Sequence, residues 1–116
     1  MATGVLIVDD DRRFRLSARE LLAGRGYEIF GEAGSAREAR AAMASRWPDA
    51  VLLDVNLPDA DGVDLAAELR GSHPGVRVLL TSSDPGAVPR RLVERSGARG
   101  FVAKTQLALA DLAGYL

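Results

Sequence analysis

The sequence predicts an α/β fold in which a five-stranded parallel sheet is covered by helices on both faces. Five short apolar segments of strand length alternate along the chain with segments whose apolar residues recur at helical spacing. The connections are short, and neither a linker, a repeat nor a low-complexity tract interrupts this order. Right-handed crossovers between such units lead to a doubly wound, three-layer, flavodoxin-like sandwich. We therefore expect one (βα)5 domain over residues 1–116.

The third apolar segment is the one around which the chain is organised. It stays apolar from Ala50 to Leu53 and then ends on a carboxylate, Asp54. A run without polar alternation indicates a strand that is buried on both faces. Pro58 and Gly62 come soon after Asp54 and indicate that a loop follows the strand. The predicted strands are residues 4–8, 27–30, 50–54, 76–80 and 100–103.

Helical periodicity accounts for most of the segments between these strands. In the first predicted helix, Phe14, Ala18, Leu21 and Leu22 share one face, and Gly24 with Gly26 ends it. Ser35 is placed to cap the second helix, with Glu38 completing a capping box. Met43 and Trp47 belong to the expected inner face of that helix and are predicted to lie in the core. A third helix is predicted over 62–70 and a last one from about Gln106.

The segment before the fourth helix is unusual. It contains Pro85 and Pro89, and Pro89 lacks the N–H that would bond back to Pro85 in a helix beginning at Asp84. Proline is favoured at the start of a helix, so we expect the fourth helix to begin only near Pro89 and to centre on residues 90–95. The result is a short, mobile helix after a long loop.

Composition excludes several classes of function. The formal net charge of −1 gives no broad electrostatic basis for binding nucleic acid or an anionic membrane. The absence of cysteine excludes disulfides and thiolate chemistry, and the only histidine, His73, is expected to be a solvated surface residue. No apolar run approaches the ~20 residues that span a bilayer, and no signal peptide is visible. We expect a cytoplasmic location and no membrane contact.

Polar side chains follow four of the predicted strands. Asp9 and Asp10 come after the first strand, Asp54 ends the third, Thr81 follows the fourth, and Lys104, the only lysine, follows the fifth. The carboxyl ends of parallel strands meet at one edge of the sheet, so these side chains are expected to converge. The neighbouring Asp11 is instead expected to cap the first helix.

Such a cluster needs a cation. Two carboxylates ~5 Å apart repel by about 3 kcal/mol at an effective dielectric of ~20. Mg²⁺ suits a site with a few carboxylates that keeps its water ligands. With a metal ion bound and Lys104 beside it, Asp54 stays ionised and can act as a nucleophile. The metal, the lysine and the Thr81 hydroxyl could then hold the oxygens of a transferred phosphoryl group.

These residues, in this order, resemble the receiver (CheY-like) domain of bacterial two-component response regulators. The resemblance covers essentially the whole chain. It includes the residues at the expected strand ends and four more positions around them: Asp9, Asp10, Asp54, Asn56, Pro58, Gly62, Thr81, Phe101 and Lys104.

The resemblance implies a role for each site residue. Asp54 would accept a phosphoryl group from a phosphohistidine on a sensor histidine kinase or phosphotransfer protein. Asp9, Asp10, Asp54 and the backbone carbonyl of Asn56 would hold Mg²⁺. Lys104 would pair with Asp54 and later with the phosphate. The chain would catalyse its own phosphorylation and hydrolysis without being a conventional enzyme.

The resemblance also implies a switch. Thr81 would turn its hydroxyl to a phosphate oxygen as Phe101 swings inward, which would remodel the surface of the fourth helix, fifth strand and fifth helix. That surface would control an output partner, an output domain such as a DNA-binding transcription regulator, or a homodimer. The domain itself would bind no nucleic acid. Thr105 replaces the proline that many receivers have after the lysine, and Phe101 replaces the commoner tyrosine.

Two other functions stay open. An atypical receiver could work as a phosphorylation-independent interaction module, for which Pro85 and Pro89 are the main argument. A small Mg²⁺-dependent phosphatase or nucleotide-binding protein would also use an acidic site. Asp9, Asp10 and Asp11 occupy the place of a glycine-rich phosphate loop, and the connections leave little room for a segment to cover a substrate.

Overall fold

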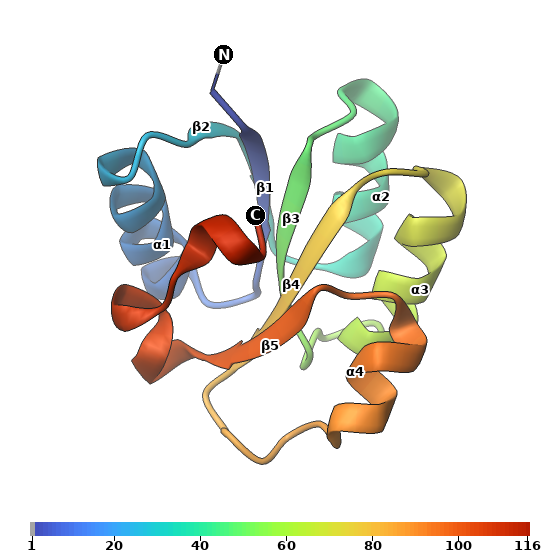
Figure 1. Ribbon diagram of the computed structural model, residues 1–116. Coiled ribbons are helices and arrows are strands. Elements are labelled where there is room, and N and C mark those ends of the chain that lie inside the picture. Colours follow the sequence, from blue (N-terminus) through green and yellow to red (C-terminus); the bar gives the residue numbers. More distant parts are fainter. Residues whose placement is uncertain (1) are drawn as a thin grey trace.

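The computed structural model describes residues 2–116 and contains one parallel sheet with the strand order β2-β1-β3-β4-β5 (Figure 1). The order reverses between β1 and β3, so the chain is wound in both directions from the middle of the sheet, as predicted. The strands are β1 Gly4–Val8, β2 Glu28–Ala33, β3 Ala50–Asp54, β4 Arg77–Ser82 and β5 Gly100–Ala103. The second strand therefore begins one residue later than expected and continues three residues further.

Helices cover both faces of this sheet. The core residues of α2, α3 and α4 pack against one face, while those of α1 and the C-terminal segment pack against the other. The α-helices are α1 Arg12–Gly24, α2 Ala36–Ser45, α3 Gly62–Ser72 and α4 Arg90–Ser96. No helix among residues 2–116 is both long and apolar enough to cross a membrane.

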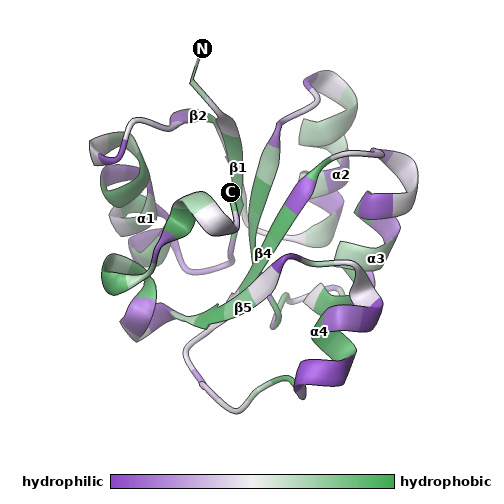
Figure 2. Cartoon of the chain, in the orientation of Figure 1, coloured by the Kyte–Doolittle hydropathy of each residue, from purple (hydrophilic) through white to green (hydrophobic). Residues whose placement is uncertain are grey.

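The two central strands supply the core. All five residues of β1 and all five of β3 are buried, and Figure 2 shows the hydrophobic residues that run along them. Their side chains alternate between the faces, so Val8 and Leu53 meet the α2–α3 side while Ile7 and Leu52 meet the α1 side. Each fully buried side chain of this size contributes roughly 1.5–3 kcal/mol. Burial on both faces explains the unbroken apolar runs.

Three helices begin at side-chain caps. The Asp11 carboxylate accepts a hydrogen bond from the Arg13 N–H at 2.9 Å, which confirms its predicted role. Ser35 caps α2 by accepting from the Glu38 N–H at 3.1 Å. The Glu38 carboxylate accepts from the Gly34 N–H rather than from that of Ser35, so the predicted capping box is displaced by one residue. Asp61 caps α3 in the same way as Asp11 caps α1.

Trp47 does not lie in the core, which contradicts the sequence-based prediction, although Met43 does. Helix α2 ends at Ser45, Arg46 is extended, and the residue before Pro48 is biased away from helical geometry. Trp47 is 54% exposed, and its ring meets that of His73 edge-on with centroids 4.7 Å apart. His73 is consequently half-buried rather than solvated.

The predicted last helix is also wrong. Two 3-10 helices, η1 Lys104–Leu109 and η2 Leu112–Gly114, replace it, with an extended residue, Ala110, between them. Leu107 and Leu112 are both buried, yet on one α-helix five residues would turn them about 140° apart. The break lets both side chains reach the core. Arg25 holds the segment by donating to the carbonyls of Ala108 and, at 2.6 Å, Ala110.

The fourth helix follows the prediction. Helix α4 spans only seven residues, begins at Arg90, and has Pro89 at its N-cap. A loop stabilised by side-chain turns precedes it: Ser82 Oγ accepts from the Asp84 N–H at 3.1 Å, and Asp84 accepts from the Gly86 N–H at 2.8 Å. The mobility of this helix stays a prediction.

Candidate functional site

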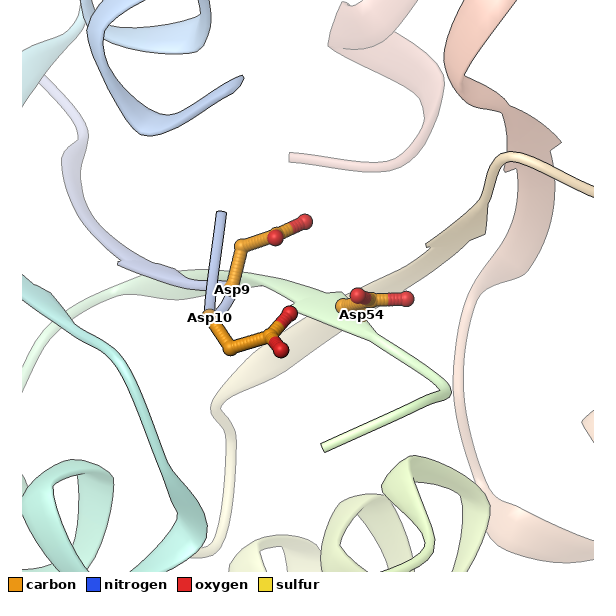
Figure 3. Close-up of side chains that lie close together, drawn as sticks. All are labelled: Asp9, Asp10 and Asp54. Carbon is orange, nitrogen blue, oxygen red and sulfur yellow. The ribbon is translucent and has the colours of Figure 1, made fainter. Parts of the chain in front are cut away.

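Three carboxylates gather at the carboxyl edge of the sheet. Asp9 and Asp10 follow β1 directly, and Asp54 is the last residue of β3, the neighbouring strand. Figure 3 shows the Asp9 and Asp10 side chains extending toward the side where Asp54 lies, and one oxygen from each residue falls within 4.8 Å of the others. Asp9 and Asp54 are buried, whereas Asp10 is exposed. The predicted convergence of these residues is therefore present.

Lys104 completes the cluster from the end of β5. Its Nζ lies 2.7 Å from Asp9 Oδ2 and 3.7 Å from Asp54 Oδ2. The predicted contact with Asp54 is present, but the closer partner is Asp9, which the sequence did not indicate. The lysine therefore serves as a counter-charge shared by two buried carboxylates.

Burial raises the pKa of Asp54 above that of an ordinary aspartate, because the carboxylate loses water. The neighbouring charges of Asp9 and Asp10 raise this pKa further. The Asn56 N–H, 3.2 Å from Asp54 Oδ1, and the Lys104 ammonium lower it, without cancelling the rise. A cation bound at the cluster would favour the ionised form.

Thr81 is the register partner of Asp54 on the adjacent strand β4. It is completely buried, and among the described residues its hydroxyl has no hydrogen-bond partner. A buried hydroxyl without a partner costs free energy that a bound oxygen ligand could recover. Asp9 Oδ2 is also buried, but it is paired with the Lys104 ammonium at 2.7 Å and among the described residues accepts no further hydrogen bond.

The loop after Asp54 is held tightly against β3. Asn56 forms a bridge with Asp61, and the Gly62 N–H donates to the Val55 carbonyl at 2.8 Å. A Cβ at position 62 would lie 2.2 Å from the carbonyl oxygen of Asp54. Position 62 therefore requires glycine because the backbone of β3 approaches too closely for a Cβ. In the sequence, Gly62 indicates only a loop and does not predict this contact.

Sequence reasoning missed two neighbours of the site. Asp59 accepts from the N–H groups of Ala36 at 2.8 Å and Arg37 at 3.0 Å, so the loop after β3 also caps α2. Hydrogen bonds from these two N–H groups lower the pKa of Asp59. Arg15 donates to the backbone carbonyl of Asp9 at 2.6 Å. No local pattern marks such contacts, because Asp59 and α2 are distant in the chain and the Arg15 bond depends on the direction in which its side chain leaves α1.

Phe101 lies away from the acidic cluster and packs, half-buried, against the α2–α3 side of the core. It lines a groove of about 410 Å³ together with Val88, Val93 and Tyr115. The prediction that the fourth helix, fifth strand and a fifth α-helix form this surface is therefore wrong in its last part. Tyr115, which directly follows η2, borders the groove where a fifth α-helix was expected. Thr81 and Phe101 are not in register on neighbouring strands, since Phe101 pairs with Leu80.

The cluster fits a divalent cation. Three carboxylates supply hard oxygen ligands, and one buried oxygen still has acceptor capacity. Asp10, Asp54 and Lys104 open onto a pocket of about 480 Å³, which leaves room for water ligands and for a phosphoryl group. Chemically, the arrangement can hold a tetrahedral anion between a nucleophilic carboxylate, a cation and an ammonium.

Comparisons with known proteins agree with this geometry. The profile of the family described as "Response regulator receiver domain" matches residues 5–113. A putative transcriptional regulator of Pseudomonas aeruginosa is 37% identical over 97% of this chain and 58% of its own length. The chemotaxis protein CheY of Thermotoga maritima is 30% identical over 90% of this chain and 87% of its own. The structure of Vibrio cholerae CheY4 superimposes with a TM-score of 0.87 and 25% identity, with both chains covered completely.

The chain spans only part of some of these relatives, 58% of the Pseudomonas regulator and 52% of the regulatory protein PdtaR of Mycobacterium tuberculosis. It spans most of the chemotaxis protein. The shared part is thus the unit that carries the acidic cluster, and the chain belongs to the family of response regulator receiver domains.

Proposed function

We propose that this chain is a phosphorylatable signalling switch in which Asp54 accepts a phosphoryl group from a phosphohistidine. The observation that carries the proposal is the position of Asp54, a buried carboxylate beside two further carboxylates and 3.7 Å from a lysine ammonium. Its partner in signalling would be a sensor histidine kinase or a phosphotransfer protein, and its location would be cytoplasmic.

In the transfer step, an oxygen of Asp54 attacks phosphorus as the bond from phosphorus to the imidazole nitrogen breaks. The departing nitrogen takes the electron pair of that bond, and an aspartyl phosphate is formed. Mg²⁺ held by Asp9, Asp10, Asp54 and the Asn56 carbonyl would neutralise charge on the transferred group. Lys104 orients one phosphoryl oxygen. Hydrolysis by water later returns the carboxylate and releases inorganic phosphate.

Thr81 would couple this chemistry to the surface. Its buried, unpartnered hydroxyl would donate to a phosphoryl oxygen, and Phe101 would move inward from its half-buried position. The groove beside Phe101 would then change shape for an output partner, an output domain or a second copy of the chain. Several relatives are named as transcriptional regulators, which supports a DNA-binding output.

The test is intact mass after incubation with Mg²⁺ and acetyl phosphate. We expect the addition of one phosphoryl group, lost in Asp54→Asn and with a chelator. Asp111→Asn is the matched control, because Asp111 is an exposed aspartate of the C-terminal segment and does not line the pocket that contains Asp54 and Lys104. This control should still form the adduct.

Rapid hydrolysis could hide the adduct, so beryllofluoride binding is measured in parallel by thermal shift. The proposal would be overturned if the chain formed no adduct and beryllofluoride produced no rise in the unfolding midpoint. The chain would then be a phosphorylation-independent interaction module, which the short α4 and the two 3-10 helices favour.

A further inference from the structure

The ammonium of Lys104 has a third neighbour besides the two carboxylates. Its Nζ lies 4.2 Å from the centroid of the Phe14 ring. Phe14 is in the first turn of α1, is half-buried, and borders the pocket that contains Asp54 and Lys104. Helix α1 and strand β5 are far apart in sequence, so the contact is made only by the fold.

A ring in this position attracts the ammonium without fixing it to one place. The negative face of an aromatic ring attracts a cation within about 6 Å of its centroid, and the attraction grows when water is excluded. Only 18% of the Lys104 side chain is exposed. Because a ring face has no single acceptor atom, the ammonium can keep this contact while it moves between Asp9 and Asp54.

The lysine needs such a neighbour. Its side chain is flexible, and its Nζ is within hydrogen-bond distance of Asp9 but not of Asp54. To orient a phosphoryl oxygen on Asp54, the ammonium must leave its closer partner and stay in the pocket. If the two carboxylates were its only neighbours, the ammonium would stay at Asp9. There it would neutralise Asp9 rather than the phosphoryl group on Asp54.

We infer that Phe14 is a positioning residue for Lys104, which keeps the ammonium over the pocket and within reach of Asp54. This inference rests on the proposed function for its effect on phosphorylation. The contact itself is independent of that function. The competing explanation is that Phe14 only packs, since it also borders an apolar hollow with Leu21 and Leu107.

The first test needs neither metal nor phosphodonor. Because Lys104 is the only lysine, selective ¹³C labelling of lysine gives one set of ε-methylene signals. In the wild-type chain we expect these protons to show an upfield ring-current shift. Phe14→Leu, which keeps an apolar side chain, should abolish it, and Phe14→Tyr should retain it. An unchanged lysine signal in Phe14→Leu would overturn the inference.

The second test measures the rate of adduct formation over a range of acetyl phosphate concentrations. Phe14→Leu should lower the maximal rate about five- to tenfold with little change in the half-saturating concentration. Ring-fluorinated phenylalanines at position 14 should lower it progressively while they preserve packing. Leu16→Ala, at an exposed position of the same helix, should leave the rate unchanged.

A double-mutant cycle separates positioning from packing. In a Lys104→Ala background, Phe14→Leu should have no further effect on the rate; an equal effect in both backgrounds would contradict action through the lysine. If the wild-type chain forms no adduct and binds no beryllofluoride, the proposed function fails, whereas the lysine signal still decides whether Phe14 holds Lys104.

Discussion

At the scale of single residues, several features of the site lower the free energy of unfolding of the unliganded protein. Asp54 and Asp9 are buried where apolar residues could pack, and the hydroxyl of Thr81 has no partner within the described chain. Such features persist at sites where binding compensates for them. The free-energy cost of the buried carboxylates can be measured. Replacing a charged side chain of the site by a neutral one should stabilise the unliganded protein.

Asp54→Asn should raise the midpoint of thermal unfolding at neutral pH in the absence of divalent cations. Burial raises the folded-state pKa of Asp54, so the stabilising effect of its protonated form is complete below the unfolded pKa. It is lost as the pH rises through the folded pKa. The advantage of the variant should therefore vanish in acid. A variant less stable than wild type at neutral pH would contradict this account.

Lys104→Met should lower the free energy of unfolding by about 1–3 kcal/mol, because it leaves the buried Asp9 carboxylate without its close counter-charge. Urea titration at neutral pH, without divalent cations, measures the loss. Adding Asp9→Asn to the same chain should recover most of it. If the double variant is as unstable as Lys104→Met alone, the lysine stabilises the fold by packing rather than by charge.

At the scale of elements, the start of α3 is determined by how closely it approaches β3. Gly62→Ala should lower the free energy of unfolding by about 3 kcal/mol, since the new Cβ would collide with the backbone of Asp54 rather than with a flexible side chain. Gly71→Ala is the matched control in the same helix, where a Cβ meets nothing within 4 Å. That change should stabilise the protein by up to about 1 kcal/mol.

Elements defined by local pattern were predictable, and those defined by contacts across the fold were not. The apolar runs of β1 and β3 and the proline at the start of α4 act locally. The C-terminal segment is different, because Leu107 and Leu112 are buried at a spacing that one α-helix cannot satisfy and Arg25 of α1 holds the break between them. The composition of this segment is typical of a helix and does not indicate the break.

The same distinction applies to the candidate site. The convergence of Asp9, Asp10, Asp54 and Lys104 follows from the rule that parallel strands end at one edge. The preference of Lys104 for Asp9, and the Phe14 ring beside it, depend on side-chain directions that the strand order does not specify.

At the scale of the whole molecule, the only tryptophan and the acidic cluster lie at opposite ends of the sheet. Trp47 precedes β3 and Asp54 ends it, so about 13 Å of strand separates the two ends. Adding Mg²⁺ and beryllofluoride should raise the unfolding midpoint but leave the emission of the exposed Trp47 unchanged. A shift in emission on binding would show that the change extends through β3 to its far end.

The Asp59 cap allows the loop after Asp54 to be observed from a neighbouring helix. The N–H groups of Ala36 and Arg37 donate to this carboxylate instead of to water. Their hydrogens can exchange with deuterium only when the loop moves off α2, while those deeper in the helix wait for the helix itself to open. Exchange at these two amides therefore reports how often the loop opens, in the native chain and without altering any residue of the site.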